Sequence, residues 1–195
     1  MASQNHAPNA GNQTNIAPLW CGLALGLSLH ILKPYAHNRK KKHAMGRLTE
    51  ILTVAQQRAR DAQLPYEGAL TPSEAAELLT LAPGAKLVDV RSRAELDLVG
   101  SIPSALHVEW MTYPGWHLNP NFLAQLKQVA DPESLMLFIC RNGQRSHRAA
   151  EAAMLAGYPD CYNVLEGFEG DLDKQTQQRG QTGGWRKNGL PWLQT

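Results

Sequence analysis

The feature that most constrains this sequence is a hydrophobic strand that leads straight into a cysteine-containing turn and then a helix. Leu135–Ile139 (LMLFI) is the most hydrophobic strand candidate in the body of the chain. The turn CRNGQRS, residues 140–146, follows at once, and an alanine-rich helical segment continues to about Ala156. This order is typical of an α/β domain, in which ligands bind beyond the carboxyl ends of the strands.

The rest of the body alternates between strands and helices in the same way. The expected elements are a helix over 46–63, a short helix after the capping box at 71–74 (TPSE), strands at 86–90, 105–110 and 162–165, and a helix over 119–130. We therefore predict an α/β fold with a central, mostly parallel sheet flanked by helices and an N-terminal helical extension. The residues after 165 are expected to be loop-rich, with Trp185 and Trp192 packed back onto the body.

Charge separates the first 45 residues from the rest. Residues 1–45 hold five Lys and Arg and no acid, whereas residues 46–195 hold 14 Lys and Arg against 17 Asp and Glu. The body is therefore mildly acidic although the whole chain carries a net charge of +2. This balance argues against a broad nucleic-acid surface, and we expect no nucleic-acid partner.

The same 45 residues leave three interpretations open. Residues 2–15 are predicted to be disordered, and residues 16–32 form an uncharged run at the lower limit of a membrane span. The run is a membrane anchor, a loosely docked leader, or sequence upstream of a true start at Met45; the last two are favoured over the anchor. The expected divisions are a leader over 1–45, a helix over 46–65 and a domain over 66–195, with the body in the cytoplasm.

Cys140 lies where an open α/β sheet binds its ligands. Its turn directs backbone N–H groups inward, and the positive end of the following helix adds to this anion site. Arg141 and Arg145 supply positive charge, and Gly143 suits a tight turn. A thiolate beside such groups is a nucleophile prepared for a small anionic substrate, whereas the alternative is a buried structural cysteine. The three cysteines show no C-x-x-C spacing, so we expect no metal site.

At these residues the sequence resembles the rhodanese family of single-domain sulfurtransferases. The likeness covers about residues 66–195. The matching segments are CRNGQRS (140–146) for the family pattern Cys-x-x-Gly-x-Arg-Ser, LVDVR (87–91) followed by Glu95, IPSA (102–105), NVLEGF (163–168), GW (184–185) and GLPW (189–192). Two departures are Ser101 and Ser104, which replace the usual His and Gly, and residues 170–183 form a longer polar insertion that we expect to shape the mouth of the site.

The resemblance implies a mechanism and assigns roles to the turn. The Cys140 thiolate would take the outer sulfur of thiosulfate or another sulfane donor and pass it from a persulfide to cyanide, a thiol or a protein cysteine. The N–H groups of residues 141–145, which include Asn142, Gly143 and Gln144, would cradle the persulfide. Arg141 and Arg145 would attract the anionic donor, although Arg145 anchors the loop in an alternative interpretation.

Further residues are expected to support this site. Ser146 would cap the helix, and Asp89 with Arg91 would form a structural ion pair. Cys161 is expected to pack in the core, with a resolving cysteine as the alternative. No cofactor is required.

Three other functions compete with this one. Related folds perform phosphatase or arsenate reductase chemistry with a Cys-x5-Arg loop, but here only four residues separate Cys140 from Arg145, which suits a smaller cradle. A rhodanese-like binding or regulatory module without turnover is the second alternative. A sulfur relay to another protein's cysteine is the third, and it shares the first half-reaction.

Overall fold

The computed structural model describes residues 24–194, with side chains from residue 41 onward. The chain divides into two units, residues 1–42 and 43–195, and everything below concerns the second. The elements are α1 (Ala24–Asp61), β1 (Gly68–Leu70), α2 (Pro72–Leu81), β2 (Lys86–Asp89), α3 (Arg93–Val99), β3 (Leu106–His107), β4 (Met111–Thr112), β5 (His117–Leu118), α4 (Phe122–Val129), β6 (Met136–Ile139), α5 (Gln144–Leu155) and β7 (Cys161–Val164).

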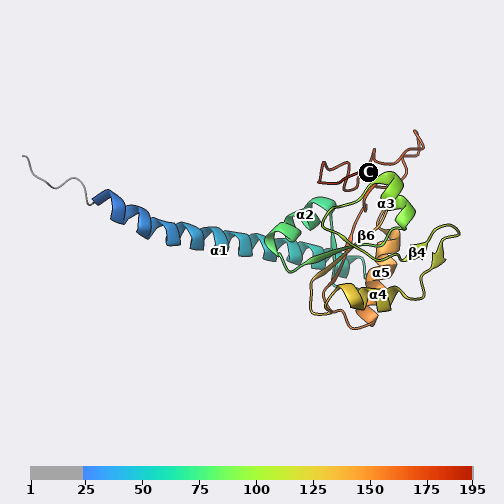
Figure 1. Ribbon diagram of the computed structural model, residues 1–195, viewed down its shortest axis with the longest axis horizontal. Coiled ribbons are helices and arrows are strands. Elements are labelled where there is room, and N and C mark those ends of the chain that lie inside the picture. The colour runs from blue at the N-terminus through green and yellow to red at the C-terminus, as the bar shows by residue number, and fades with distance from the viewer. Residues whose placement is uncertain (1–23, 195) are drawn as a thin grey trace, which may run out of the picture. The chain divides into compact units, whose positions relative to one another are not determined.

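A five-stranded sheet in the order β1-β7-β6-β2-β3 forms the centre of the second unit (Figure 1). All four strand pairs are parallel, so the carboxyl ends of the strands meet at one edge. In the register, Ile139 of β6 lies beside Asp89 of β2. The residues that follow these two strands, Cys140 and Val90, therefore enter the same edge of the sheet. The predicted mostly parallel sheet is confirmed.

Two hydrophobic clusters cover the two faces of this sheet. Along β6, Met136 and Phe138 belong to one cluster with side chains from α4 and α5. Leu137 and Ile139 belong to the other with side chains from α1 and α2. This alternation follows from the two-residue period of a strand, and all four side chains are fully buried because helices cover both faces. Trp185 is buried and Trp192 packs against the second cluster, as the sequence predicts.

Several elements differ from the sequence prediction. Helix α1 begins at Ala24 rather than near residue 46. Helix α3 lies where we expected a loop; its capping box at Ser92 and Glu95 is the signal that the prediction overlooked. The edge strand β1 and the hairpin β4–β5 were also missed, because strands of two or three residues are too short to show a periodic pattern.

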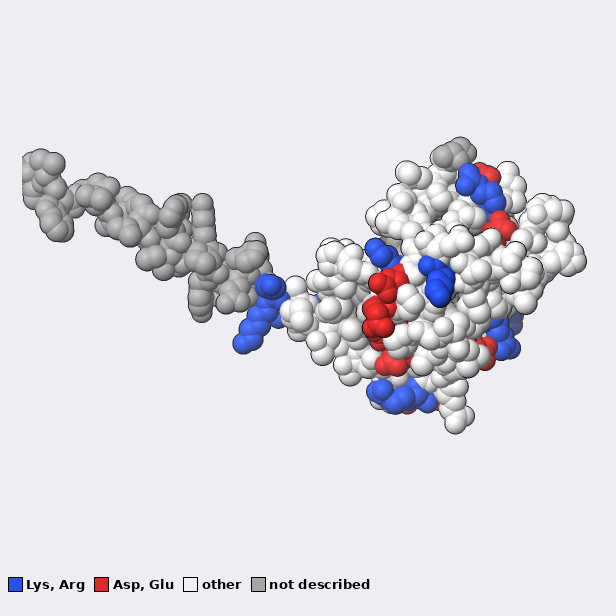
Figure 2. All heavy atoms as spheres, turned by 60° about the horizontal axis from the view of Figure 1, so that its bottom comes forward, with Lys and Arg blue, Asp and Glu red and all other residues white. Residues whose placement is uncertain are grey.

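The N-terminal predictions fall largely outside the described residues. The stretch predicted to be disordered, 2–15, and the first part of the uncharged run at 16–32 both lie there. Among the helices of the described part, none combines the length and the apolarity that a membrane crossing needs. On the face of the second unit drawn in Figure 2, acidic and basic side chains lie interspersed on a mostly uncharged surface.

Candidate active site

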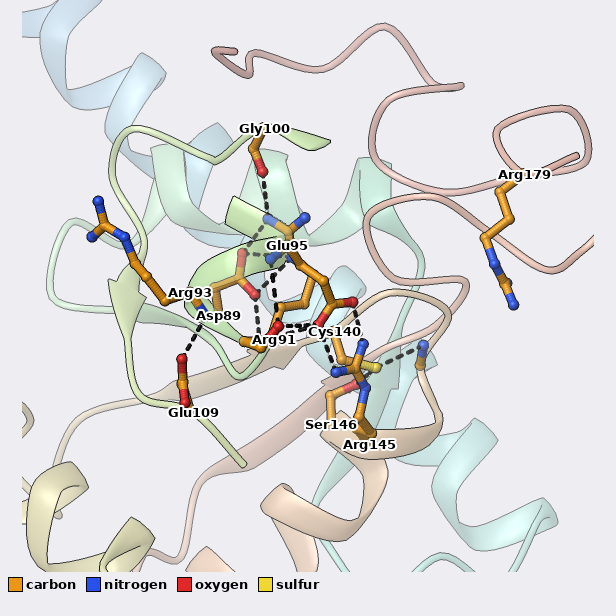
Figure 3. Close-up of polar contacts among 12 residues, drawn as sticks. Asp89, Arg91, Arg93, Glu95, Gly100, Glu109, Cys140, Arg145, Ser146 and Arg179 are labelled. Carbon is orange, nitrogen blue, oxygen red and sulfur yellow. Dashed lines mark hydrogen bonds and ion pairs between the residues drawn. The ribbon is translucent and has the colours of Figure 1, made fainter. Parts of the chain in front are cut away.

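The loop after β6 holds Cys140 at the carboxyl edge of the sheet, and the Cys140 side chain is fully buried. Its Sγ accepts hydrogen bonds from the Gly143 backbone N–H at 3.2 Å and from the Ser146 hydroxyl at 3.3 Å (Figure 3). Gly143 has a φ of +91° and is the N-cap of α5, so it provides the tight turn that the sequence suggested. Two donors and the positive end of a helix of 12 residues therefore surround one sulfur atom.

The position of Ser146 corrects one prediction. We expected Ser146 to cap the helix, but α5 already begins at Gln144 and Ser146 lies within its first turn. The Ser146 side chain is completely buried, and its hydroxyl points at the cysteine sulfur rather than at a free backbone N–H. Ser146 is therefore a contact of the Cys140 sulfur.

A turn at residues 166–169 supports the loop from behind. Phe168 N–H donates to the Cys140 carbonyl at 2.8 Å, and Glu169 N–H donates to the Arg141 carbonyl at 2.9 Å. Gly167 passes so close that a Cβ there would lie 2.7 Å from the backbone N of Asn142 and 2.7 Å from the carbonyl carbon of Arg141. This contact requires a glycine, which accounts for Gly167 between Glu166 and Phe168.

Arg145 is committed to the carboxylate of Glu95. Its two terminal nitrogens donate to the two Glu95 oxygens at 2.8 and 2.6 Å, and the side chains are only 14% and 11% exposed. Burial by itself would lower the pKa of Arg145, but the hydrogen bonds and the charge of Glu95 outweigh burial and raise it. Of the two roles left open for Arg145, the geometry favours loop anchoring over attraction of the donor.

Glu95 receives further support from the cap of its own helix. The Ser92 backbone N–H and hydroxyl each donate to Glu95 at 3.0 Å. Burial tends to raise the pKa of Glu95, yet the hydrogen bonds from Arg145 and Ser92 lower it overall. The carboxylate is thus held charged between α3 and the active loop.

Asp89 and Arg91 form the ion pair that the sequence suggested. Arg91 Nη2 lies 2.6 Å from Asp89 Oδ2, and both side chains are essentially buried. The same nitrogen donates to the Gly100 carbonyl at 2.9 Å, and the guanidinium stacks over Phe168 at 3.9 Å from the ring centroid. Because this pair joins β2 to the segment behind the loop, its position agrees with the predicted structural role.

The other predicted loop residues are partly or fully exposed to solvent. Asn142 donates from its amide to Asp171 Oδ1 at 2.9 Å, which links the loop to the polar insertion. Arg141 is half-buried, and its Nε is buried with no partner among the described residues. Gln144 is exposed at the start of α5.

Comparison with known proteins fits this geometry. A family model described as "Rhodanese-like domain" matches residues 71–174, which is more than half of the chain. The chain belongs to the rhodanese-like domain family. Membership confirms the predicted fold.

Individual relatives agree with this assignment. The crystal structure of Rv0390 from M. tuberculosis is 44% identical, with a TM-score of 0.62 over 67% of this chain and 99% of that one. "Uncharacterized protein RP600 homolog" of Rickettsia rickettsii is 35% identical over 62% of this chain and 92% of its own length. "Protein HIGH ARSENIC CONTENT 1, mitochondrial" of Arabidopsis thaliana is 28% identical over 48% of this chain and 56% of its own length.

Sequence reasoning missed three residues that contact the active loop of this rhodanese-like domain. Glu95 and Asn163 were noted only as parts of motifs, although the capping box of Glu95 with Ser92 was readable. Asn163 donates from its amide to the Gly143 carbonyl at 3.2 Å, and Trp116 lies over the Arg145 guanidinium at 5.1 Å. Neither contact has a signal in local spacing, because β7 and the β4–β5 hairpin reach the loop only through the tertiary fold.

Cys161 lies in the core, as the sequence analysis favoured. It begins β7 opposite Met136, whereas Cys140 follows the other end of β6, so the two cysteines are separated by about four residues of strand, roughly 13 Å. The Cys161 thiol is buried and donates to the Tyr158 carbonyl, and burial raises its pKa to about 12. A role as resolving cysteine therefore does not fit this geometry.

The described part of the chain holds no group of three or more His, Cys, Asp or Glu side chains arranged to bind a metal ion.

Proposed function

We propose that this protein is a sulfurtransferase that carries sulfane sulfur on Cys140. The Cys140 thiolate attacks the outer sulfur of thiosulfate; the S–S bond of the donor breaks, sulfite leaves with the bonding electron pair, and a persulfide remains. Cyanide then attacks the terminal sulfur, thiocyanate leaves, and the thiolate is regenerated. A thiol or a cysteine of another protein takes the sulfur in the same way, and a low-molecular-weight persulfide can replace thiosulfate as donor.

The observation that carries this proposal is the pair of donors aimed at the Cys140 sulfur. The Gly143 N–H and the Ser146 hydroxyl contact it at 3.2 and 3.3 Å, and the N-terminus of α5 faces it. These groups favour a negatively charged sulfur, as thiolate or as persulfide. Because they belong to the backbone and to a buried side chain, they need no reorganisation when the charge moves to the outer sulfur.

The state of Arg145 favours sulfur transfer over phosphoryl chemistry. A loop arginine that stabilises a phosphate must offer its guanidinium to the substrate, whereas Arg145 is paired at both terminal nitrogens with Glu95. A sulfur atom held by two donors does not need that guanidinium.

The test is the intact mass of the purified full chain after incubation with excess thiosulfate. The wild type should gain the mass of one sulfur atom, and cyanide should remove it with release of thiocyanate. Cys140→Ala should gain nothing. Cys161→Ala is the matched control, because it also removes a buried thiol, and it should gain and lose the sulfur like the wild type.

Two other results would refute the proposal. If folded wild type gains no sulfur from thiosulfate or from a persulfide donor, a binding module without turnover replaces it. If the protein instead hydrolyses an aryl phosphate in a Cys140-dependent manner, the phosphatase interpretation replaces it. Circular dichroism of each variant establishes that loss of the adduct does not come from unfolding.

A further inference from the structure

The anionic end of a sulfur donor needs a cation that is not already neutralised. Figure 3 labels Arg91, Arg93 and Arg145, and each of these has a carboxylate partner: Asp89, Asp97 and Glu95, respectively. Arg179 is the remaining labelled arginine. It has no ion pair within the described residues and donates from Nη1 only to the neutral carbonyl of Gly170 at 2.9 Å. In Figure 3 the Arg179 side chain runs down the right-hand side of the picture, and no dashed line joins it to another residue drawn there.

Backbone hydrogen bonds tie Arg179 to the active loop. The Arg141 carbonyl accepts from Glu169 N–H at 2.9 Å, and the Glu169 carbonyl accepts from Gly180 N–H at 2.7 Å. The residue next to Gly180 is Arg179, so the path between the backbones of the two arginines passes through two residues, Glu169 and Gly180. The side-chain bond from Asn142 to Asp171 links the same two segments a second time.

The insertion that carries Arg179 is closed at its base. Gly170 N–H, at its start, donates to the Glu166 carbonyl at 2.9 Å, and Gly184 N–H, just past its end, donates to the Glu166 carboxylate at 2.8 Å. Inside the insertion, Asp173 accepts from the backbone N–H groups of Gln175 and Thr176, both at 2.8 Å. A loop whose two ends meet and whose interior is hydrogen-bonded presents Arg179 in a fixed place.

We propose that Arg179, together with Arg141, forms a subsite for the sulfonate end of a thiosulfate-type donor. The inference rests on the proposed sulfur transfer and adds how the donor is recognised. Displacement at sulfur is in line, so the leaving sulfite must point away from the Cys140 sulfur and toward the mouth of the loop. Arg141 belongs to the loop, and the insertion over 170–183 is bonded to the same loop between Asp171 and Asn142. A guanidinium can donate two parallel N–H bonds to two oxygen atoms of a sulfonate.

The first experiment measures binding without reaction. In the full chain with Cys140→Ser, thiosulfate is titrated at constant ionic strength and followed by two-dimensional NMR of the backbone amides. Adding Arg179→Gln should weaken binding about tenfold, the effect of losing one charge-assisted contact at a partly exposed site. Adding Lys174→Gln, which removes the same charge from an exposed position of the same insertion, should leave binding within twofold.

The second experiment measures turnover with Cys140 present. Arg179→Gln should raise KM for thiosulfate about tenfold and leave KM for cyanide within twofold, and Arg179→Lys should recover part of the loss. An equal rise of both KM values, or the same loss in Lys174→Gln, would show a general field effect and overturn the subsite. Unchanged thiosulfate binding in Arg179→Gln would also overturn it.

The two proposals fail in different ways. If thiosulfate binds Cys140→Ser and Arg179→Gln weakens that binding, but the wild type never gains sulfur, the subsite is upheld and the sulfurtransferase reaction is refuted. If the wild type gains sulfur at the same thiosulfate concentration as Arg179→Gln, the reaction is upheld and the subsite is refuted.

Discussion

The pair formed by Arg145 and Glu95 makes a quantitative prediction about stability. Glu95→Gln keeps the size of the side chain but removes its charge, so one Arg145 N–H faces an amide NH₂ and the guanidinium stays buried without a counter-ion. Breaking a buried ion pair on one side costs about 3–5 kcal/mol. Because both side chains retain slight exposure, 14% and 11%, the lower end applies, and we expect a loss of about 3 kcal/mol.

The same helix provides the control. Arg93 and Asp97 form an i,i+4 pair on α3, but their side chains are 72% and 52% exposed. Asp97→Asn is the same chemical change, and water screens the charge that remains, so its cost should not exceed about 0.5 kcal/mol. The comparison therefore measures burial of the pair and not the general effect of removing a carboxylate from α3.

Urea unfolding followed by circular dichroism gives both free energies, and thermal unfolding gives a second measure. A loss of about 3 kcal/mol in a unit of this size lowers Tm by about 6–12 °C. If Glu95→Gln and Asp97→Asn differ by less than about 1 kcal/mol, the pair contributes no more than a surface contact. Arg145 would then not anchor the active loop through Glu95.

The stability that the Glu95 carboxylate contributes should depend on pH. Its pKa is lowered in the folded state, so this contribution is complete above the unfolded pKa of about 4.3 and is lost as pH falls through the folded pKa. The Tm difference between wild type and Glu95→Gln should therefore shrink below pH 4, and a constant difference would contradict this. Gly167→Ala should lower the free energy of unfolding by about 2–4 kcal/mol, because its Cβ would overlap the backbone of the loop. Gly180 is the control: it has a φ of +76°, but a Cβ there would have no neighbour within 4 Å, so Gly180→Ala should cost only about 1 kcal/mol. Equal losses would assign the effect to backbone strain alone. Burial raises the pKa of Cys161 to about 12, so iodoacetamide at pH 8 should leave Cys161 unlabelled in the native protein and label it in urea. Peptide mass spectrometry measures the labelling, and rapid labelling of the native protein would refute the assigned burial.

The sequence predicted the elements whose pattern is local and strong. The strand before Cys140 is hydrophobic without interruption because both faces of β6 are covered, and the capping box at Thr71 begins α2 as expected. Cys140 could be placed at the carboxyl edge of the sheet because only the order strand, turn and helix was needed. The family resemblance supplied the rest of the loop assignment.

What the sequence did not predict depends on contacts between distant segments. Glu95 and Arg145 are 50 residues apart, and their pairing requires α3 and α5 to meet at one edge of the sheet. Gly167 is needed because another backbone passes beside it, which no local pattern of side chains records. Ser146 was assigned as a cap because serine is common at helix starts, but the N-cap position belongs to Gly143, and the serine hydroxyl serves the sulfur instead.

The site separates two tasks that one arginine would otherwise combine. With Arg145 paired to Glu95, the charge that the proposed mechanism places on the Cys140 sulfur would be balanced by a backbone N–H, a buried hydroxyl and the end of α5, all of them fixed by the fold of the loop. In the same proposal, recognition of the rest of the donor falls to Arg141 and to Arg179 on the insertion. The insertion joins the loop through Asn142 and through the turn behind Cys140, but neither of the two donors to the Cys140 sulfur lies in it. We therefore expect that its sequence can change the preferred donor while the sulfur chemistry at Cys140 is retained. Replacing Arg179 should accordingly change the order in which anionic and neutral donors are used, with no change in the rate at which the persulfide gives up its sulfur.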